Sequence, residues 1–274
     1  MRIFFRLQNF ISKITAYEIT KRQKLVLMSV CLTGLLITTQ TVDVDMRFQT
    51  IGVLALATII LSTFALWGEL SGIKYFLLLL LPVYFVAGAS LFYFLLPVRW
   101  LTRLPFALLF GISVYLLMLT SNIFNIAAIR TIGLLRAAHA VGLLFSLISV
   151  FFLANVLFSL HLHFYLIVVG TILITFPLYL VDLWSYELEN HISSRVLVHA
   201  LIFTLVTVQI ALILSFWPIV PINGALALAT VMYVLLGLGQ FEFSGKLTSR
   251  VAWEHLVVAF IVFTVVVITT RWSG

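Results

Sequence analysis

The sequence predicts an all-helical membrane protein, a bundle of eight or nine transmembrane spans preceded by an amphipathic segment. Of its 274 residues, 63% are hydrophobic and 9% are charged, whereas soluble domains carry about 45–50% apolar and about 25% charged residues. Apolar runs near the length that crosses a bilayer as a helix, about 20 residues, recur from end to end. These observations exclude a soluble globular domain and leave no stretch long enough for a separate water-soluble catalytic domain.

The first 23 residues predict an amphipathic helix at the membrane surface. Ile3, Leu7 and Ile14 recur at helical spacing, and Arg2 and Arg6 lie on the other face. No convincing small-residue cleavage site follows the first long apolar run, so we expect no cleaved signal peptide. We therefore divide the chain into an interfacial segment, residues 1–23, and a single transmembrane domain, residues 24–274.

Run length and bounding charges place nine spans in the transmembrane domain. They cover residues 25–40, 48–68, 74–96, 105–126, 137–158, 162–182, 196–217, 223–241 and 254–271. The first is the shortest. Arg99 and Arg103 fall on the predicted outer side, against the usual distribution of charge, so eight spans is the alternative.

The distribution of basic residues predicts an N-terminus inside and a location in the cytoplasmic membrane. With this orientation the cytoplasmic segments hold Arg2, Arg6, Lys13, Lys21, Arg22, Lys24, Lys74, Arg130, Arg136, Arg195, Lys246 and Arg250. The outer segments hold Arg47, Arg99, Arg103 and Arg271. We interpret the formal charge of +7 as attraction to anionic headgroups, and we expect membrane lipids, not nucleic acid, as partners.

Polar side chains gather at the predicted cytoplasmic ends of the spans, where they predict a ligand site. The candidate ligand-binding residues are Asn122, Asn125, Arg130, Arg136, His139, Asp182 and His199. Arg136 and His139 are three residues apart and share a helix face, and arginine binds phosphate through paired hydrogen bonds. The alternative is that these groups only meet headgroups and water, with Arg136 reaching the interface and His139 bonding a neighbouring helix.

The middle of each predicted span lacks Asp, Glu, Lys and Arg, and Gln209 is the most polar side chain at mid-depth. Charged residues inside spans usually mark ion or proton paths. The pattern therefore argues against an ion-coupled or proton-coupled transporter, although backbone carbonyls remain possible ligands. Small residues four apart, such as Ala138 and Gly142, predict close helix packing.

We expect neither a metal nor a cofactor. His161 and His163 form an H-x-H pair that Asp43 and Asp45 could join, but a plain interfacial loop accounts for them. The carboxylates and His191 between residues 182 and 191 match no metal-binding loop spacing and predict a solvated loop. Familiar motifs of soluble enzymes are absent, and the single cysteine, Cys31, excludes an intramolecular disulfide.

The segment SNIFNIAAIRTIGLLRAAHAVGLLF, residues 121–145, resembles a bacterial family of multi-pass membrane proteins of unknown function. The resemblance is clearest over residues 104–160. It implies a membrane location and a bacterial source, and it assigns no catalytic or binding residue.

Three functions fit the pattern. The leading hypothesis is a non-enzymatic protein that binds or moves a lipid-like or small hydrophobic molecule, with Arg130, Arg136 and His139 contacting its anionic group at the cytoplasmic side. The second is an intramembrane enzyme acting on a lipid-linked phosphate, with His139, His199 or Asp182 as acid or base. The third is an assembly or scaffold subunit that packs against a membrane protein partner.

Overall fold

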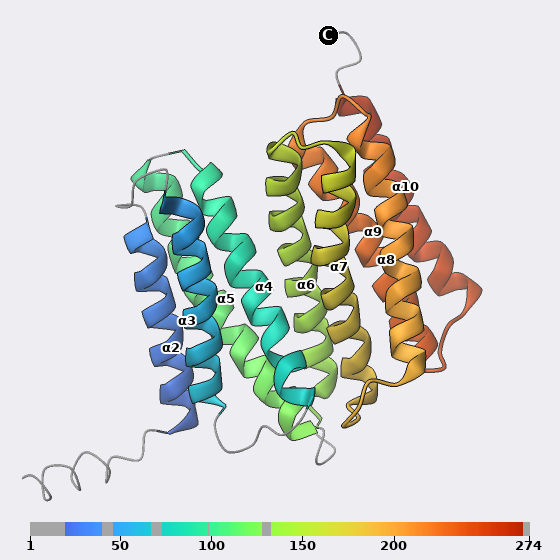
Figure 1. Cartoon of the computed structure of the whole chain (residues 1–274). Helices are drawn as coiled ribbons and strands as arrows, with labels where there is room; N and C mark the ends of the chain where they lie inside the picture. Colours follow the sequence, from blue (N-terminus) through green and yellow to red (C-terminus); the bar gives the residue numbers. More distant parts are fainter. Residues whose placement is uncertain (1–19, 40–45, 67–72, 98, 128–132, 271–274) are drawn as a thin grey trace, which may run out of the picture.

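A computed structural model describes residues 20–39, 46–66, 73–97, 99–127 and 133–270 (Figure 1), and within these ranges the chain folds into antiparallel helices without any strand. The helices are α2 (Lys21–Thr38), α3 (Arg47–Ala65), α4 (Ile73–Leu95), α5 (Trp100–Ala127), α6 (Leu135–Ser159), α7 (Phe164–Glu187), α8 (Ser194–Ser215), α9 (Pro221–Phe243) and α10 (Ser249–Thr269). The predicted all-helical bundle is thus confirmed, while nearly all of the predicted amphipathic segment lies outside the described residues.

Each helix overlaps one predicted span, but the number that can cross a membrane differs. Seven helices, α4 to α10, are long and apolar enough to span a bilayer, whereas the sequence predicts eight or nine spans. The first turn of α2 carries Lys21, Arg22 and Lys24. In α3 the side chains that the structure describes begin at Gln49, and they form an apolar stretch of 17 residues, Gln49–Ala65.

Charged side chains of both signs gather at one end of the bundle, where the basic ones are more numerous. The even-numbered helices begin, and the odd-numbered helices finish, at the end that is lowest in Figure 1. We call this the basic end, because Lys21, Lys74, Arg136, Arg195 and Arg250 lie there, each within the first few residues of its helix. It corresponds to the side that the sequence predicts to be cytoplasmic.

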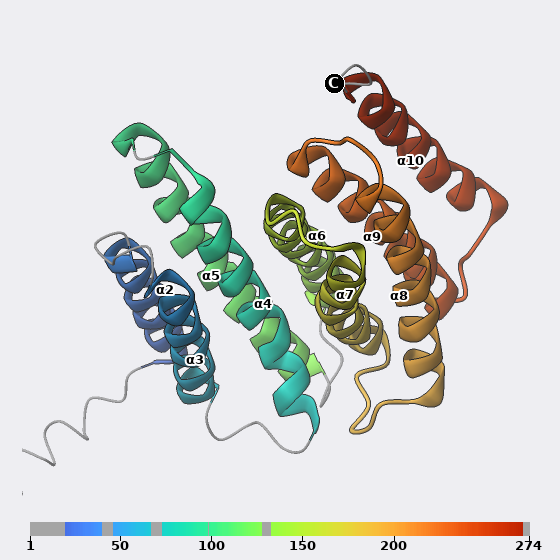
Figure 2. The same cartoon turned by 45° about the horizontal axis from the view of Figure 1, so that its top comes forward.

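Helix α6 is the centre of the bundle and packs against α4, α5, α7 and α9. Figures 1 and 2 show α2 to α5 on one side and α6 to α10 on the other, joined mainly where α4 meets α6. Stacked aromatic rings fill this junction: the ring centroids of Phe92 and Phe152 are 4.6 Å apart, and Phe85 meets Phe145 edge to face at 5.2 Å. Such pairs add to the dispersion energy that holds helices together in lipid.

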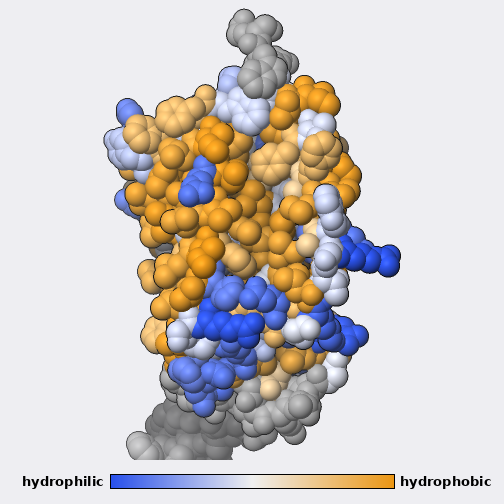
Figure 3. Space-filling view, turned by 90° about the vertical axis from the view of Figure 1, so that its right-hand side faces the viewer, coloured by the Kyte–Doolittle hydropathy of each residue, from blue (hydrophilic) through white to orange (hydrophobic). Residues whose placement is uncertain are grey.

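Helix α10 lies at the edge of the bundle and packs mainly on α9 (Figure 2). Only 6% of its apolar stretch of 18 residues is buried inside the bundle. Figure 3 shows the side of the molecule that carries this helix: the surface is largely hydrophobic, and its largest hydrophilic patch lies toward the basic end. A broad apolar belt of this kind is what a protein embedded in lipid presents to its surroundings.

Candidate functional site

The structure separates the two residues that the sequence pairs as phosphate ligands. Arg136 is exposed in the first turn of α6, whereas His139 is half-buried and turned toward α7. The His139 imidazole stacks on Tyr186 with ring centroids 4.0 Å apart, and its Nε2 lies 2.9 Å from the Ser185 carbonyl oxygen. His139 therefore bonds a neighbouring helix, as the alternative interpretation predicts. The third member, Arg130, lies outside the described residues.

The two asparagines flank the same region from α5. Asn125 is buried and Asn122 is half-buried near the end of this helix. Between them, the Phe124 ring lies 5.4 Å from the His139 ring, measured between centroids. The Phe124 ring therefore joins the end of α5 to His139 at the contact between α5 and α6, close to the basic end.

Asp182 lies deeper than the sequence predicts. The predicted sixth span ends at this residue, but α7 continues to Glu187, which places Asp182 about 7–8 Å before the helix end. In this last part of α7, Trp184 is buried and its indole N–H donates to the Glu189 carbonyl, 2.9 Å away. Asp182 is enclosed as well, with 5% of the residue exposed.

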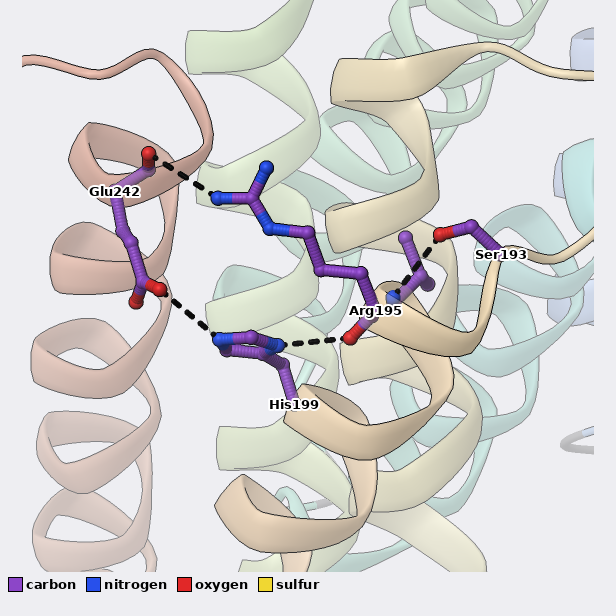
Figure 4. A network of polar contacts seen from close by, with 5 residues as sticks. Ser193, Arg195, His199 and Glu242 are labelled. Carbon is purple, nitrogen blue, oxygen red and sulfur yellow. Dashed lines mark hydrogen bonds and ion pairs between the residues drawn. The ribbon is translucent and has the colours of Figure 1, made fainter.

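His199 belongs to a separate group of contacts between α8 and α9 (Figure 4). Its Nε2 lies 3.2 Å from Glu242 Oε1, and its Nδ1 lies 2.8 Å from the Arg195 carbonyl oxygen. The Arg195 guanidinium donates to the Glu242 carbonyl and lies 4.3 Å from the centroid of the Phe243 ring. Both ring nitrogens of His199 are therefore engaged. The cluster connects the start of α8 to the end of α9.

A second candidate, which sequence reasoning missed, is an apolar groove between α2 and α5. Its volume is about 550 Å³, within the range of about 300–1,000 Å³ typical of small-molecule sites. The lining residues are Val26, Ser29, Val30, Thr33, Gly34, Ile37, Ala107, Leu108, Gly111, Ile112 and Tyr115. The Ser29 and Thr33 hydroxyls donate to carbonyls of their own helix, so the groove offers an almost purely apolar surface.

Small residues create this groove. A Cβ atom placed on Gly111 would lie 2.6 Å from Thr33 Oγ1, so the two helices approach closely only because Gly111 has no side chain. A Cβ on Gly34 would meet nothing within 4 Å, which leaves the groove open beside it. The run of Ser29, Thr33 and Gly34 along one face of α2 is the sequence signal that could have located it.

A cation lies at the basic-end extension of the groove. Arg22 is exposed and precedes Val26 by four residues, so it occupies the same face of α2 one turn closer to the basic end. On the neighbouring face, the Lys24 ammonium lies 5.3 Å from the centroid of the Phe64 ring. The groove therefore runs from an apolar interior toward basic side chains.

The described part of the chain contains no group of three or more His, Cys, Asp or Glu side chains that could hold a metal ion. His161 bonds its own turn instead, with Nδ1 2.9 Å from the Ser159 carbonyl oxygen.

Comparison with known proteins does not assign this chain to a family. No protein-family model, curated protein or solved structure matches the chain. The resemblance of residues 104–160 to a bacterial membrane protein family therefore stays a prediction, and the chain is described by what its residues show: an integral membrane protein with seven long apolar helices.

Proposed function

We propose that this protein binds a phospholipid-like molecule, with an acyl chain in the α2–α5 groove and an anionic headgroup at the basic end. The groove between α2 and α5 is the observation that carries this proposal. It keeps the lipid-like ligand that the sequence predicts but moves the site from the α5–α6 connection to α2 and α5.

Shape and polarity support an acyl chain as the occupant of the groove. Val30, Leu108 and Ile112 line it and are exposed on the outer surface of the bundle, where lipid tails surround the protein. A lipid tail that passes the groove without entering it would leave a gap beside these side chains, which forfeits dispersion contacts on one side. A flexible hydrocarbon chain restores those contacts along the groove.

Charge complementarity supports an anionic headgroup. Arg22 lies one turn beyond Val26 on the same face of α2, with Lys24 close by. A guanidinium binds a phosphate group through two parallel charge-assisted hydrogen bonds. Basic residues beside a membrane surface also attract anionic lipids, by about 1 kcal/mol each. The proposed ligand therefore carries a phosphate at the basic end.

Native mass spectrometry of the full chain in nanodiscs of phosphatidylglycerol and phosphatidylcholine tests the proposal. We expect the wild type to retain phosphatidylglycerol preferentially. Gly34→Leu should reduce retention because its side chain fills open space in the groove. Arg22→Gln should weaken retention roughly tenfold, the loss of a charge-assisted contact of about 1.5 kcal/mol.

Two matched controls make the result specific. Gly52 lies on α3, outside the groove, and a Cβ there also meets nothing within 4 Å, so Gly52→Leu should retain the lipid. Arg136→Gln removes an exposed cation at the same end of the bundle and should also retain it. Equal retention in wild type and Gly34→Leu would contradict the groove, whereas loss only in Arg136→Gln would return the site to the α5–α6 connection.

A further inference from the structure

In the described part of the bundle, the Asp182 carboxyl and the Ser146 hydroxyl form a buried polar pair in which each side chain has an unsatisfied oxygen. Asp182 lies on α7 and is 5% exposed, and Ser146 lies on α6 and is fully buried. The hydroxyl lies beside the carboxyl. Nevertheless, within the described residues, neither Ser146 Oγ nor Asp182 Oδ2 completes a hydrogen bond of good geometry.

A buried carboxylate in this position needs a positive charge. Moving an ion of this size from water into a protein interior costs several kcal/mol even after relaxation, and the usual outcomes are pairing, ion binding or neutralisation. Among the described side chains, no Lys or Arg forms an ion pair with Asp182; the pairs that occur join His191 to Glu189, His199 to Glu242 and Arg250 to Glu254.

The groups nearest to the Asp182 carboxyl come mainly from α6 and α7. On α6, Gly142 faces it: a Cβ there would lie 3.9 Å from Asp182 Oδ1 and 3.6 Å from the Phe124 ring. The titratable groups around the carboxyl are Tyr179 and Tyr186 on α7 and His139 on α6. On the side of α8, the Tyr179 hydroxyl meets the Thr207 hydroxyl.

We propose that Asp182 and Ser146 form a binding site for one monovalent cation, a proton or an alkali-metal ion, between α6 and α7. A proton on Asp182 could be donated to Ser146 Oγ and would satisfy both oxygens at once. An alkali-metal ion would take the same two oxygens as ligands. Half-buried His139 and Tyr186 lie between this pair and the basic end, so the cation exchanges with solvent on that side. This site is independent of the lipid groove.

The sequence-based argument against an ion-coupled transporter concerns the middle of each span. Asp182 lies outside the middle of α7, about 7–8 Å before its end. An ionisable group enclosed in a membrane helix is nevertheless a candidate functional site, because its burial is costly.

Carbodiimide labelling of the full chain in nanodiscs tests the proposal, since dicyclohexylcarbodiimide modifies protonated carboxyls in apolar surroundings. We expect labelling of the Asp182 peptide, located by mass spectrometry and abolished in Asp182→Asn. Labelling that falls as pH rises, and is unchanged by sodium or potassium, identifies the proton as the cation. Protection by sodium or potassium at fixed pH identifies an alkali-metal ion.

Two variants keep the outcome decisive. Ser146→Ala removes the second oxygen and leaves the fold intact. It should change the proton or cation concentration of half-maximal labelling several-fold. Arg130→Gln tests a cation of the α5–α6 connection: labelling that appears only in this variant would make Arg130 the countercharge and overturn the proposal. Labelling that responds to neither pH nor cations would overturn it as well, because the carboxyl would then be permanently neutral.

Discussion

A single buried hydroxyl pair illustrates how residues hold this bundle together. Tyr179 on α7 and Thr207 on α8 are both fully buried, and their hydroxyl oxygens are 2.7 Å apart. Thr207 also donates to the Phe203 carbonyl of its own helix, 2.8 Å away, so its oxygen accepts the Tyr179 proton. Because lipid offers no competing water, a bond of this kind between helices is retained, although its net value is modest.

We expect a double-mutant cycle of Tyr179→Phe and Thr207→Val to give a coupling free energy near 0.6 kcal/mol and below about 1.7 kcal/mol. Each single variant removes one hydroxyl without changing the packing volume much. The measurement is reversible unfolding in mixed micelles, followed by circular dichroism. A coupling free energy indistinguishable from zero would show that the hydroxyl pair does not join α7 to α8.

Residue-scale predictions from the sequence succeeded where local spacing decides the outcome and failed where neighbouring helices decide it. Small-residue spacing predicts close packing at Gly142, and a Cβ there would lie 3.6 Å from the Phe124 ring and 3.9 Å from Asp182 Oδ1. Arg136 and His139 share a helix face, but their spacing does not predict which helix lies opposite. In the structure the His139 imidazole contacts α7, whereas Arg136 is exposed. Asp182 is enclosed beside Gly142 and Ser146 of α6, and local periodicity does not show which helix covers it.

At the scale of helices, α10 is attached to α9 where the His255 ring meets Gly237. A Cβ on Gly237 would lie 2.2 Å from His255 Nε2. The imidazole is held there by the Val251 carbonyl, 2.8 Å from Nδ1, and by the Tyr233 ring, which stacks at 5.1 Å between centroids. Near the other end of α10, the Asn223 amide of α9 donates to Thr269 Oγ1, 2.9 Å away, so α10 is attached to α9 near both of its ends.

Gly237→Ala should weaken the attachment of α10, because the new methyl group occupies the position of the His255 ring. We expect a loss of about 1–3 kcal/mol, the usual cost of overpacking. Adding His255→Ala should recover part of this loss by making room. Gly52→Ala is the matched control, since a Cβ at Gly52 meets nothing within 4 Å. Thermal unfolding in detergent measures all four proteins, and an unchanged Tm in Gly237→Ala would contradict the proposed contact.

Helix positions were predictable from apolar run length, but helix ends were not. The predicted spans overlap α2 to α10 in order. However, α5 begins at Trp100, five residues before the predicted 105, because the helix extends beyond the apolar run and includes Arg103. Among the described residues, the seven long apolar helices are fewer than the predicted spans, since α2 begins with cations and the described side chains of α3 begin at Gln49. Composition marks the membrane segment, whereas capping and packing set the ends.

For the whole molecule, the antiparallel order of helices creates the asymmetry between the two ends. Because α2, α4, α6, α8 and α10 begin at the basic end, the connections α7–α8 and α9–α10 lie there, and the connection α6–α7 lies at the other end. Lys246 is exposed in the α9–α10 connection, and His163 is exposed in the α6–α7 connection. The positive-inside rule then predicts that Lys246 faces the cytoplasm.

Cysteine accessibility in intact cells tests this orientation. In a Cys31→Ala background, which removes the single native cysteine, His163→Cys should react with a membrane-impermeant maleimide added outside. Lys246→Cys should react only after permeabilisation, because basic connections stay on the cytoplasmic side. The reverse pattern would place the basic end outside, and with it Arg22 and the proposed headgroup contact. Labelling of both positions from outside would contradict the antiparallel path of α7 to α9 across the membrane, since three helices must carry these two connections to opposite sides.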